Sequence, residues 1–227
     1  MLEPSLNSQP APPLVARSAL PVVHAVTTDE IIARDDFIDV ACVVMAALGA
    51  RGALHLRAGR ATAARLEALA GGLEAAQALT GAWLVINDRV DLALACRARA
   101  AQLTSRSLRV ADARRAAPAL ALGASVHSVE EARAAAQEGA TWLVAGHVFA
   151  SATHPGESGR GIDFLRTLAA AIDVPVIGIG GVKPEHCAAL RQAGAHGVAA
   201  IRGIWDAANA ERAASDYLSA YDDAAGT

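Results

Sequence analysis

Eight short apolar runs alternate with longer alanine-rich segments along most of this chain of 227 residues. The runs have the length of strands, and the segments between them have the period of amphipathic helices. This alternation is typical of βα units, in which helices connect parallel strands. Eight units favour an α/β fold with a closed (β/α)8 barrel (TIM barrel), and an open doubly wound sheet is the alternative. No Gly-x-Gly-x-x-Gly sequence follows the first run, which counts against a dinucleotide-binding sheet.

The element boundaries follow from the same pattern. The predicted strands are Leu20–Val26, Ala53–Leu56, Trp83–Ile86, Ala101–Leu103, Ala119–Leu122, Trp142–Ala145, Val176–Ile179 and Gly197–Ile201. The predicted helices are Asp36–Leu48, Thr62–Gln77, Val90–Ala98, Val110–Ala116, Ser128–Glu138, Ile162–Ala171, Pro184–Ala193 and Ile204–Ala220. Ser128 stands three residues before Glu131, which is the spacing of a capping box at a helix start.

The first residues of the chain differ from the rest in composition. The segment Met1 to Ser18 holds Pro4, Pro10, Pro12 and Pro13 among small polar residues. Such a segment cannot bury enough apolar surface to offset its chain entropy. We therefore expect a disordered tail over residues 1–18 and one barrel domain over residues 19–227.

Composition excludes several classes of function. The net charge is only −3, and the 20 Lys and Arg residues are scattered, so nucleic-acid binding has little support. No apolar run reaches the roughly 18 to 20 residues of a membrane span, and no signal peptide is recognisable. The isolated Cys42, Cys96 and Cys187 are typical of a reducing compartment. We expect a cytoplasmic protein without a membrane partner, and the sequence leaves room for a homo-oligomer.

Polar residues follow the predicted strands, and in a barrel they would meet at one mouth. They are Thr27, Thr28, Arg57, Asn87, Asp88, Thr104, Ser125, His127, His147, Gly180, Gly181, Arg202 and Gly203. Among them we predict Arg57, Asn87, Ser125 and His127 as substrate contacts.

The last two strand ends carry the features of a phosphate site. Gly180 and Gly181 follow the seventh strand, and Arg202 and Gly203 follow the eighth. Barrels commonly hold phosphate with the loops after these two strands, where backbone N–H groups can surround an anion. A phosphorylated small molecule is the predicted partner, and a simple tight turn at the glycine pair is the alternative.

His147 is the predicted catalytic residue. It follows the sixth strand and precedes a glycine-rich loop, and an imidazole can give and take protons near neutral pH. His127 is expected to form the pocket floor or to cap the next helix, and Arg57 to bind a carboxylate. Arg160 either binds a carboxylate from the loop after the sixth strand or only holds that loop in place. Asp88 could ligate magnesium, but no second carboxylate accompanies it, so we predict neither a metal nor a cofactor.

Five segments together resemble the thiamine phosphate synthase superfamily, and more closely its thiazole tautomerase (TenI) branch. They are INDRVDLALA, ASVHSVEEA, GHVFASATHPGESGRG, IGIGGV and AAIRGI, within a resemblance that covers roughly Leu20 to Tyr221. The synthases carry a Gly-Pro start and a lysine at the end of the strand-six loop, and a second metal-binding Asp after the fourth strand. This chain has His147, His154 and Ser107 there.

The resemblance implies a (β/α)8 barrel that isomerises a carboxylated dihydrothiazole phosphate in thiamine biosynthesis. The family's catalytic histidine falls on His147, and this proton shift needs no redox cofactor or metal. By the same matching, the glycine pair with Arg202 and Gly203 would hold the phosphate, and Arg57 the carboxylate. The alternatives are a thiamine phosphate synthase, which displaces pyrophosphate, and a non-catalytic protein that binds thiazole phosphate.

Overall fold

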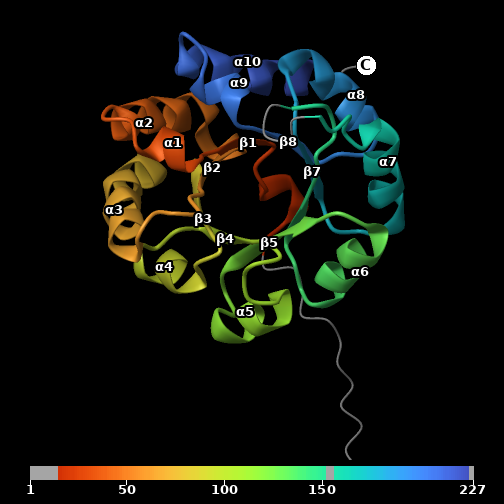
Figure 1. The fold of residues 1–227 in the computed structure, drawn as a ribbon, viewed down its shortest axis with the longest axis horizontal. Coiled ribbons are helices and arrows are strands. Elements are labelled where there is room, and N and C mark those ends of the chain that lie inside the picture. The colour runs from red at the N-terminus through yellow and green to blue at the C-terminus, as the bar shows by residue number, and fades with distance from the viewer. Residues whose placement is uncertain (1–14, 152–155, 225–227) are drawn as a thin grey trace, which may run out of the picture.

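The strands form a closed barrel. The computed structural model describes residues 15–151 and 156–224. Its eight parallel strands follow one another around the ring in chain order, and β1 pairs with β8 to close it, with Val23 beside Val198. Figure 1 looks down this ring and shows the helices arranged around its outside. The predicted (β/α)8 fold is confirmed, and the open sheet is excluded because no strand of the ring has a free edge.

The strands are β1 (Val23–Val26), β2 (Gly52–Leu56), β3 (Trp83–Asn87), β4 (Ala100–Leu103), β5 (Ala121–Val126), β6 (Trp142–Ala145), β7 (Val176–Ile179) and β8 (Gly197–Ala200). The helices are α1 (Asp29–Ile32), α2 (Phe37–Leu48), α3 (Ala63–Thr80), α4 (Val90–Ala95), α5 (Val110–Ala116), α6 (Val129–Gln137), α7 (Gly161–Ala171), α8 (Cys187–Gln192), α9 (Arg202–Trp205) and α10 (Ala210–Asp223). Three 3-10 turns, η1 (Arg17–Ala19), η2 (Gly49–Arg51) and η3 (Pro184–His186), complete the described elements.

Several predicted boundaries are wrong by a few residues, and two errors have clear physical causes. The single helix predicted over Ile204–Ala220 is two helices, because the Asn209 side chain accepts a hydrogen bond from Arg212 N and starts α10 afresh. The short helix α1 was missed, although Thr28 caps it by accepting from Ile31 N. The capping signal at Ser128 is confirmed, since its hydroxyl accepts from Glu131 N.

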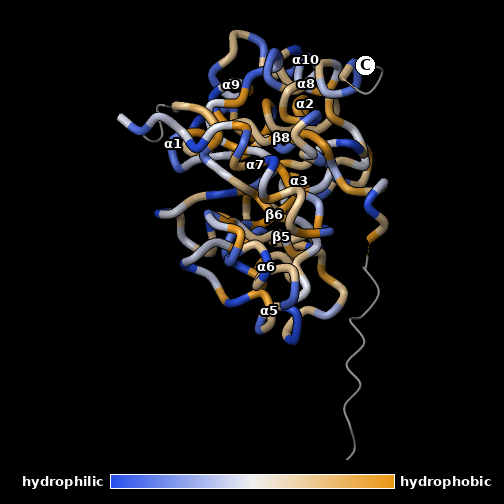
Figure 2. Tube along the Cα trace, turned by 90° about the vertical axis from the view of Figure 1, so that its right-hand side faces the viewer, coloured by the Kyte–Doolittle hydropathy of each residue, from blue (hydrophilic) through white to orange (hydrophobic). Residues whose placement is uncertain are grey.

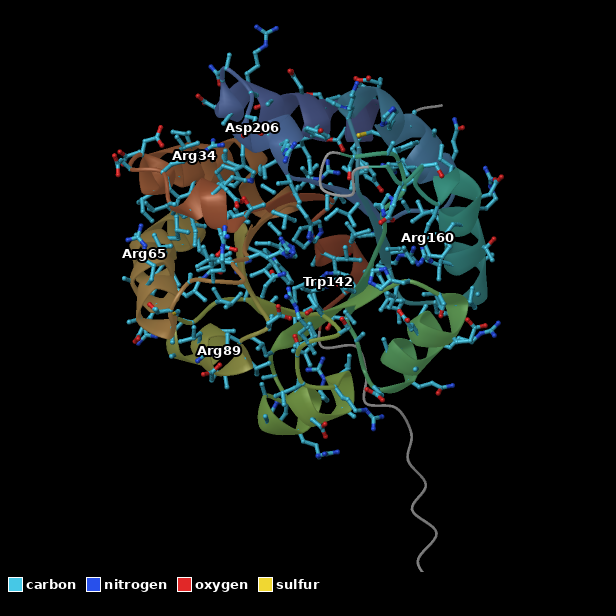
Figure 3. The ribbon with its side chains drawn as sticks, in the orientation of Figure 1. Arg34, Arg65, Arg89, Trp142, Arg160 and Asp206 are labelled. Atoms are coloured by element: carbon cyan, nitrogen blue, oxygen red, sulfur yellow. The ribbon has the colours of Figure 1, made fainter. Side chains whose placement is uncertain are left out.

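Hydrophobic side chains fill both sides of the barrel wall. Alternate residues of a strand point to opposite faces, so one set packs against the helices and the other fills the barrel interior. Leu54, Leu84 and Leu122 belong to the cluster under the helices, whereas Trp83 and Trp142 belong to the interior cluster. Figure 2 shows hydrophobic segments gathered inside and hydrophilic ones at the periphery. Figure 3 places Trp142 near the centre of the ring and Arg34, Arg65 and Arg89 on its rim.

The segment before β1 packs against the amino-terminal end of the barrel. Leu20 is 5% exposed and joins the interior cluster, and Val15 packs against the same cluster. Residues 1–14 lie outside the described residues, so the disordered tail stays a prediction. None of the helices within residues 15–151 and 156–224 is long and apolar enough to cross a membrane. The cytoplasmic location and the homo-oligomer also remain predictions.

Helix α3 allows a direct test of this packing. Leu73 is fully buried and Leu79 is 87% exposed on the same helix. We expect Leu73→Ala to lower the free energy of unfolding by about 2–5 kcal/mol, because it removes buried methyl groups and leaves a cavity. Leu79→Ala should change that free energy by less than about 0.5 kcal/mol. Urea denaturation of both variants measures the difference, and equal losses would contradict the assignment of the buried face.

Candidate active site

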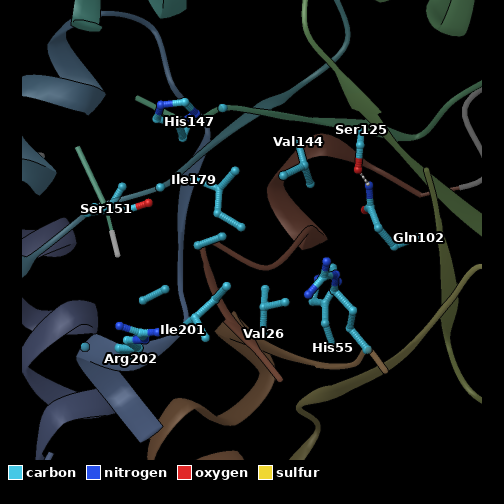
Figure 4. A pocket seen from close by; sticks show the side chains of 18 of the residues that line it. Val26, His55, Gln102, Ser125, Val144, His147, Ser151, Ile179, Ile201 and Arg202 are labelled. Atoms are coloured by element: carbon cyan, nitrogen blue, oxygen red, sulfur yellow. Dashed lines mark hydrogen bonds between the residues drawn. The ribbon is translucent and has the colours of Figure 1, made fainter. Parts of the chain in front are cut away.

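A cavity of about 560 Å³ opens at the carboxyl ends of the strands. Figure 4 shows its wall from close by, with side chains from β1, β2, β4, β5, β6 and β7 and from the β6 and β8 loops. The nine predicted site residues all line it, namely Arg57, Asn87, Ser125, His127, His147, Gly180, Gly181, Arg202 and Gly203. The structure therefore brings together residues that are as far apart in the sequence as Arg57 and Gly203.

The glycine pair after β7 packs tightly against the loop after β6. Gly180 and Gly181 both have positive φ, +98° and +64°, which side chains other than glycine rarely adopt. A Cβ on Gly180 would stand 2.3 Å from His147 Cβ, and one on Gly181 would stand 2.4 Å from the Ala150 carbonyl oxygen. Only glycine fits at these two positions, where Gly180 lies against His147 and Gly181 against Phe149 and Ala150.

The imidazole of His147 is largely enclosed by its surroundings. Its side chain is 11% exposed, and Nε2 lies 3.6 Å from a carboxylate oxygen of Glu157. Residue His147 also accepts a hydrogen bond at its carbonyl from Arg160 N, which ties it to the start of α7. The ring is thus placed between the glycine pair and the loop that precedes α7, and it shares the cavity with both.

Two arginines line the cavity from the two strands that flank β1. Arg57 follows β2, and Arg202 follows β8. Within the described part of the chain, neither guanidinium lies within 4.0 Å of a carboxylate, whereas the nearby Lys183 pairs with Glu185 at 3.7 Å. Unpaired guanidinium groups in a cavity favour an anionic ligand. The cavity therefore offers two guanidinium groups, from two different loops, to an anionic ligand.

Arg160 and His127 make contacts to the backbone and side chains of the loops at the cavity mouth. Arg160 donates to the carbonyl of His127, and its guanidinium stacks over the ring of Phe164 at 4.8 Å. Pinning of the loop, one of the two roles considered for Arg160, therefore accounts for its contacts. His127 is exposed, its N–H donates to Glu131, and it does not cap α6, because Ser128 does. The interpretation of His127 as a helix cap is wrong. Because His127 lines the cavity, its contact with the substrate stays a prediction.

The donors around Asp88 do not fit a magnesium site. One oxygen of Asp88 accepts from the Thr104 hydroxyl at 2.7 Å, from Thr104 N at 3.1 Å and from the Ser107 hydroxyl. Magnesium prefers carboxylate and phosphate oxygens, and a site held by this chain would need more than one carboxylate. Within residues 15–151 and 156–224 no three acidic, histidine or cysteine side chains cluster. His154, in the loop after β6, lies outside the described residues.

Sequence reasoning missed two of the four polar residues inside the barrel, His55 and Gln102, and misplaced the other two. Asn87 and Ser125 are not beyond the ends of their strands as predicted but within β3 and β5. His55 and Gln102 also line the cavity, from β2 and β4. All four belong to the interior face, and strict alternation from Ala53, Val85, Ala100 and Ala121 would have placed them there.

Burial favours the neutral form of three histidines, His24, His55 and His196. Burial lowers the pKa of His24 well below 6.5, and the neighbouring His55 lowers it further. Burial lowers the pKa of His55 to about 4, although the Asn87 side chain partly opposes this. Burial also lowers the pKa of His196. Because these rings resist protonation, they are neutral near pH 7 and form hydrogen bonds as neutral imidazoles.

A family model described as thiamine monophosphate synthase (TMP-TENI) matches residues 23–204. A thiamine-phosphate synthase of Roseiflexus castenholzii is 34% identical over 92% of this chain and 91% of its own length. The bifunctional protein ThiM/ThiE of Symbiobacterium thermophilum is 42% identical over 68% of this chain. A solved thiamine phosphate pyrophosphorylase of Pyrococcus furiosus superposes with a TM-score of 0.79 at 28% identity, covering 92% of this chain and 98% of that one.

These comparisons correct the expected reaction class. The relatives are named for a synthase, which is a transferase, so the prediction of an isomerase is wrong. The thiazole tautomerase branch is not supported by them, whereas the broader thiamine phosphate synthase resemblance is confirmed. The chain spans only 32% of the bifunctional relative's length, and 63–65% of the length of three further relatives.

The buried His55 predicts a loss of stability in mild acid. A histidine with a folded pKa of about 4 and an ordinary value of 6.5 stabilises the folded state fully above pH 6.5, and this stabilisation falls as pH drops towards 4. Between pH 7 and pH 5 it should remove about 2 kcal/mol from the free energy of unfolding. Urea denaturation at both values measures the change in the wild type.

The same measurement on His55→Gln isolates this histidine, because glutamine does not titrate. That variant should lose less stability than the wild type between pH 7 and pH 5. His127→Gln, a change at an exposed histidine, serves as the control and should follow the wild type. Parallel curves for the wild type and His55→Gln would contradict the burial of a neutral ring.

Proposed function

This chain belongs to the thiamine monophosphate synthase (TMP-TENI) family, and we propose that it acts as a thiamine-phosphate synthase on two phosphorylated substrates. The observation that supports the proposal is a pair of arginines that line one cavity, Arg57 after β2 and Arg202 after β8, the two strands that flank β1. A transferase that joins a pyrimidine pyrophosphate to a thiazole phosphate must hold two anionic groups at once. Two guanidinium groups on different loops of one cavity support that requirement.

In the proposed reaction, the thiazole nitrogen attacks the methylene carbon of the pyrimidine substrate. Its lone pair forms the new C–N bond as the C–O bond to pyrophosphate breaks, and pyrophosphate leaves with the electron pair of that bond. The products are thiamine phosphate and pyrophosphate. Charge grows on the leaving oxygen, so fixed cationic groups near it would favour the transition state.

The two anionic groups are assigned by geometry. The thiazole phosphate binds beside the glycine pair and Arg202, where backbone N–H groups and a guanidinium can both donate to it. The pyrophosphate binds towards Arg57, on the β2 side of the cavity. A volume of about 560 Å³ is within the usual range for a ligand pocket of a few hundred to a thousand cubic ångströms.

His147 has a different role in this proposal from the one predicted. Formation of the C–N bond requires no proton transfer from the thiazole, so the acid/base role that belonged to the isomerase is not carried forward. The Cα and Cβ of His147 lie against Gly180, and we assign the ring, which lines the cavity, as a hydrogen-bonding contact to the bound phosphate. No step is assigned to a magnesium ion, because the donors around Asp88 do not fit one.

A second candidate function is a protein that binds thiazole phosphate without turnover. The observation that favours it is the engagement of Asp88 by the hydroxyls of Thr104 and Ser107, where the synthases were expected to use a second carboxylate. Binding of thiazole phosphate by calorimetry, with no pyrophosphate released in the presence or absence of magnesium, would support this candidate over the synthase.

Two arginine variants test the assignment of the two anionic positions. Arg202→Gln should raise the KM for thiazole phosphate roughly 10- to 100-fold, and Arg57→Gln should raise the KM for the pyrimidine pyrophosphate by a similar factor. Each variant removes a charge-assisted contact to one substrate only. Pyrophosphate release measures both constants. Arg166→Gln, at an exposed arginine of α7 that pairs with Asp163, should behave like the wild type.

An effect of both arginine variants on the same substrate would contradict two separate positions. Unchanged constants in both variants would remove the arginines from the site.

The glycine pair predicts a sharp effect of one methyl group. Gly181→Ala places a Cβ 2.4 Å from the Ala150 carbonyl oxygen at a positive φ, so the turn must shift. We expect its affinity for inorganic phosphate to fall at least about tenfold, because the backbone N–H groups lose their positions. Gly71→Ala in α3, where a Cβ would meet nothing within 4 Å, is the matched control. Phosphate titration by calorimetry gives both affinities, and equal values would exclude the glycine pair as the phosphate site.

A further inference from the structure

A second cavity, of about 580 Å³, opens at the opposite end of the barrel. Arg51 and Arg99 line it from positions directly before β2 and β4, and His196 from the position before β8. Trp83, the first residue of β3, lines it as well. Among the described residues, it shares no lining residue with the cavity at the carboxyl ends of the strands. We call it the amino-end cavity, and no role assigned above uses it.

A hydrogen-bonded layer lies between the two cavities. Leu20 lines the amino-end cavity, and its carbonyl oxygen lies 3.3 Å from His196 Nε2. The carbonyl oxygen of Pro21 lies 3.2 Å from His24 Nε2, and a carbonyl can only accept, so both neutral rings carry their proton on Nε2. His24 Nδ1 then accepts from His55 Nε2 at 2.8 Å, and His55 lines the other cavity. A ligand in the amino-end cavity is therefore held apart from the carboxyl ends of the strands.

Two arginines of the amino-end cavity are held by neutral groups. The Arg99 guanidinium lies over the Trp83 ring at 5.9 Å and donates to the Gly81 carbonyl at 3.3 Å. The Arg191 guanidinium lies over the Tyr221 ring at 4.9 Å and donates to the Tyr221 carbonyl at 3.1 Å. In the described part of the chain, neither group lies within 4.0 Å of a carboxylate. A guanidinium has five N–H donors, so both arginines keep donors, and their full charge, in fixed positions.

Further positive charge surrounds the same cavity. Arg51 is the third arginine that lines it, and its guanidinium pairs with Asp222 at 2.5 Å. None of the described lining residues is acidic. Burial lowers the pKa of His196, and the charges of Arg17, Arg191 and Arg51 lower it further. The amino-end cavity therefore has an excess of positive charge.

This excess does not serve the stability of the fold. At the amino ends of the strands of such barrels, side chains usually contribute to stability. Guanidinium groups that surround one cavity instead repel one another. An anion bound between them would remove this repulsion, so the arrangement favours recognition of an anion.

The amino-end cavity is larger than an inorganic anion requires. Its volume of about 580 Å³ is similar to the 560 Å³ of the cavity at the carboxyl ends. The exposed methyl groups of Ala19 and Ala50 line it, and Leu20 and Val22 add further apolar surface. Apolar surface of this kind is stabilised by contact with a hydrocarbon group. A ligand that fills the cavity therefore has an anionic end and an apolar part.

We propose that the amino-end cavity binds a small organic phosphate, with Arg99 and Arg191 donating to the phosphoryl oxygens and the apolar part against Ala19 and Ala50. A phosphoryl group is favoured over a carboxylate because it carries more charge and offers three oxygens to several guanidinium groups. The proposal goes beyond the proposed function, because it concerns the other end of the barrel and a different set of side chains.

Nitrogen-15 NMR of the full-length protein distinguishes the two cavities. The Trp83 indole N–H reports on the amino-end cavity, and the Gly181 backbone N–H reports on the other. Phenyl phosphate is the probe, because it joins a phosphoryl group to an apolar ring. It should shift the Trp83 signal until the signal saturates, and this shift should persist in Gly181→Ala. An unshifted Trp83 signal, or saturation only above about 10 mM, would overturn the proposal.

Variants of the two arginines test their role in the same titration. Arg99→Gln and Arg191→Gln should each weaken the binding seen at Trp83 roughly tenfold, because each loses charge-assisted hydrogen bonds. Arg97→Gln is the matched control, since Arg97 is exposed in the same turn, lies 3.6 Å from Glu74 and does not line the cavity. It should bind like the wild type.

Equal affinities of Arg97→Gln and Arg99→Gln would overturn the assignment of the phosphoryl position. Should Arg191→Gln not fold, Arg99→Gln decides, because Arg99 is exposed and its truncation leaves the core unchanged.

Three further probes identify the class of ligand. Inorganic phosphate should bind several-fold more weakly than phenyl phosphate, because it buries no apolar surface. Benzoate should also bind more weakly, because it carries less charge, and phenol should leave the Trp83 signal unshifted. Equal affinity for inorganic phosphate would overturn the organic part of the proposal. Benzoate or phenol that binds as tightly as phenyl phosphate would overturn recognition of the phosphoryl group.

The outcomes also separate this inference from the proposed function. None of these measurements uses turnover, so an absence of pyrophosphate release would remove the synthase proposal and leave the amino-end cavity as a binding site. A protein that releases pyrophosphate but shows no saturable shift of Trp83 would retain the synthase proposal and exclude the second site.

Discussion

The pairing of β1 with β8 is the contact on which the rest of the molecule depends. It joins the first and last strands, Val23 beside Val198, and so turns eight βα units into a closed ring. In a closed ring of parallel strands every carboxyl end lies at the same mouth. That geometry brings Arg57 after β2 and Arg202 after β8 to one cavity, and no local sequence feature could do so.

The interior of the closed barrel contains several buried polar side chains, among them His24, His55 and Gln102. Burying a polar group without a partner costs free energy, and neighbours supply most of what His24, His55 and Gln102 need. The exception is Asn87 Oδ1, which is buried at the cavity and has no partner among the described residues. The packing of the core therefore fixes most of the hydrogen bonds of the polar groups that line the cavity from within the barrel.

Local sequence patterns predicted most of the strands and helices, but fewer of the residues at which these elements begin and end. Strands β6 and β7 were predicted residue for residue, because turn residues bound their apolar runs. The predicted end of the strand before Ser125 was wrong, since Gly123 and Ser125 look like a loop in isolation but fill the barrel interior. Within the site, the glycine pair and His147 were recognisable from their place after strands, whereas His55 and Gln102 were not, because polar residues inside strands carry no loop signal. The reaction class followed the similarity to a tautomerase branch, and comparison with synthase relatives corrected it.

The sequence by itself determined the class of fold and the set of loops that carry the chemistry, because strand and helix periodicities are local properties of the chain. Only the tertiary structure decided which side chains share the cavity and which atoms donate or accept there. The tautomer of His55 depends on a carbonyl of Pro21 that reaches it through His24, a residue of another strand. Such directionality arises from contacts between distant segments, and it exists only once the ring has closed.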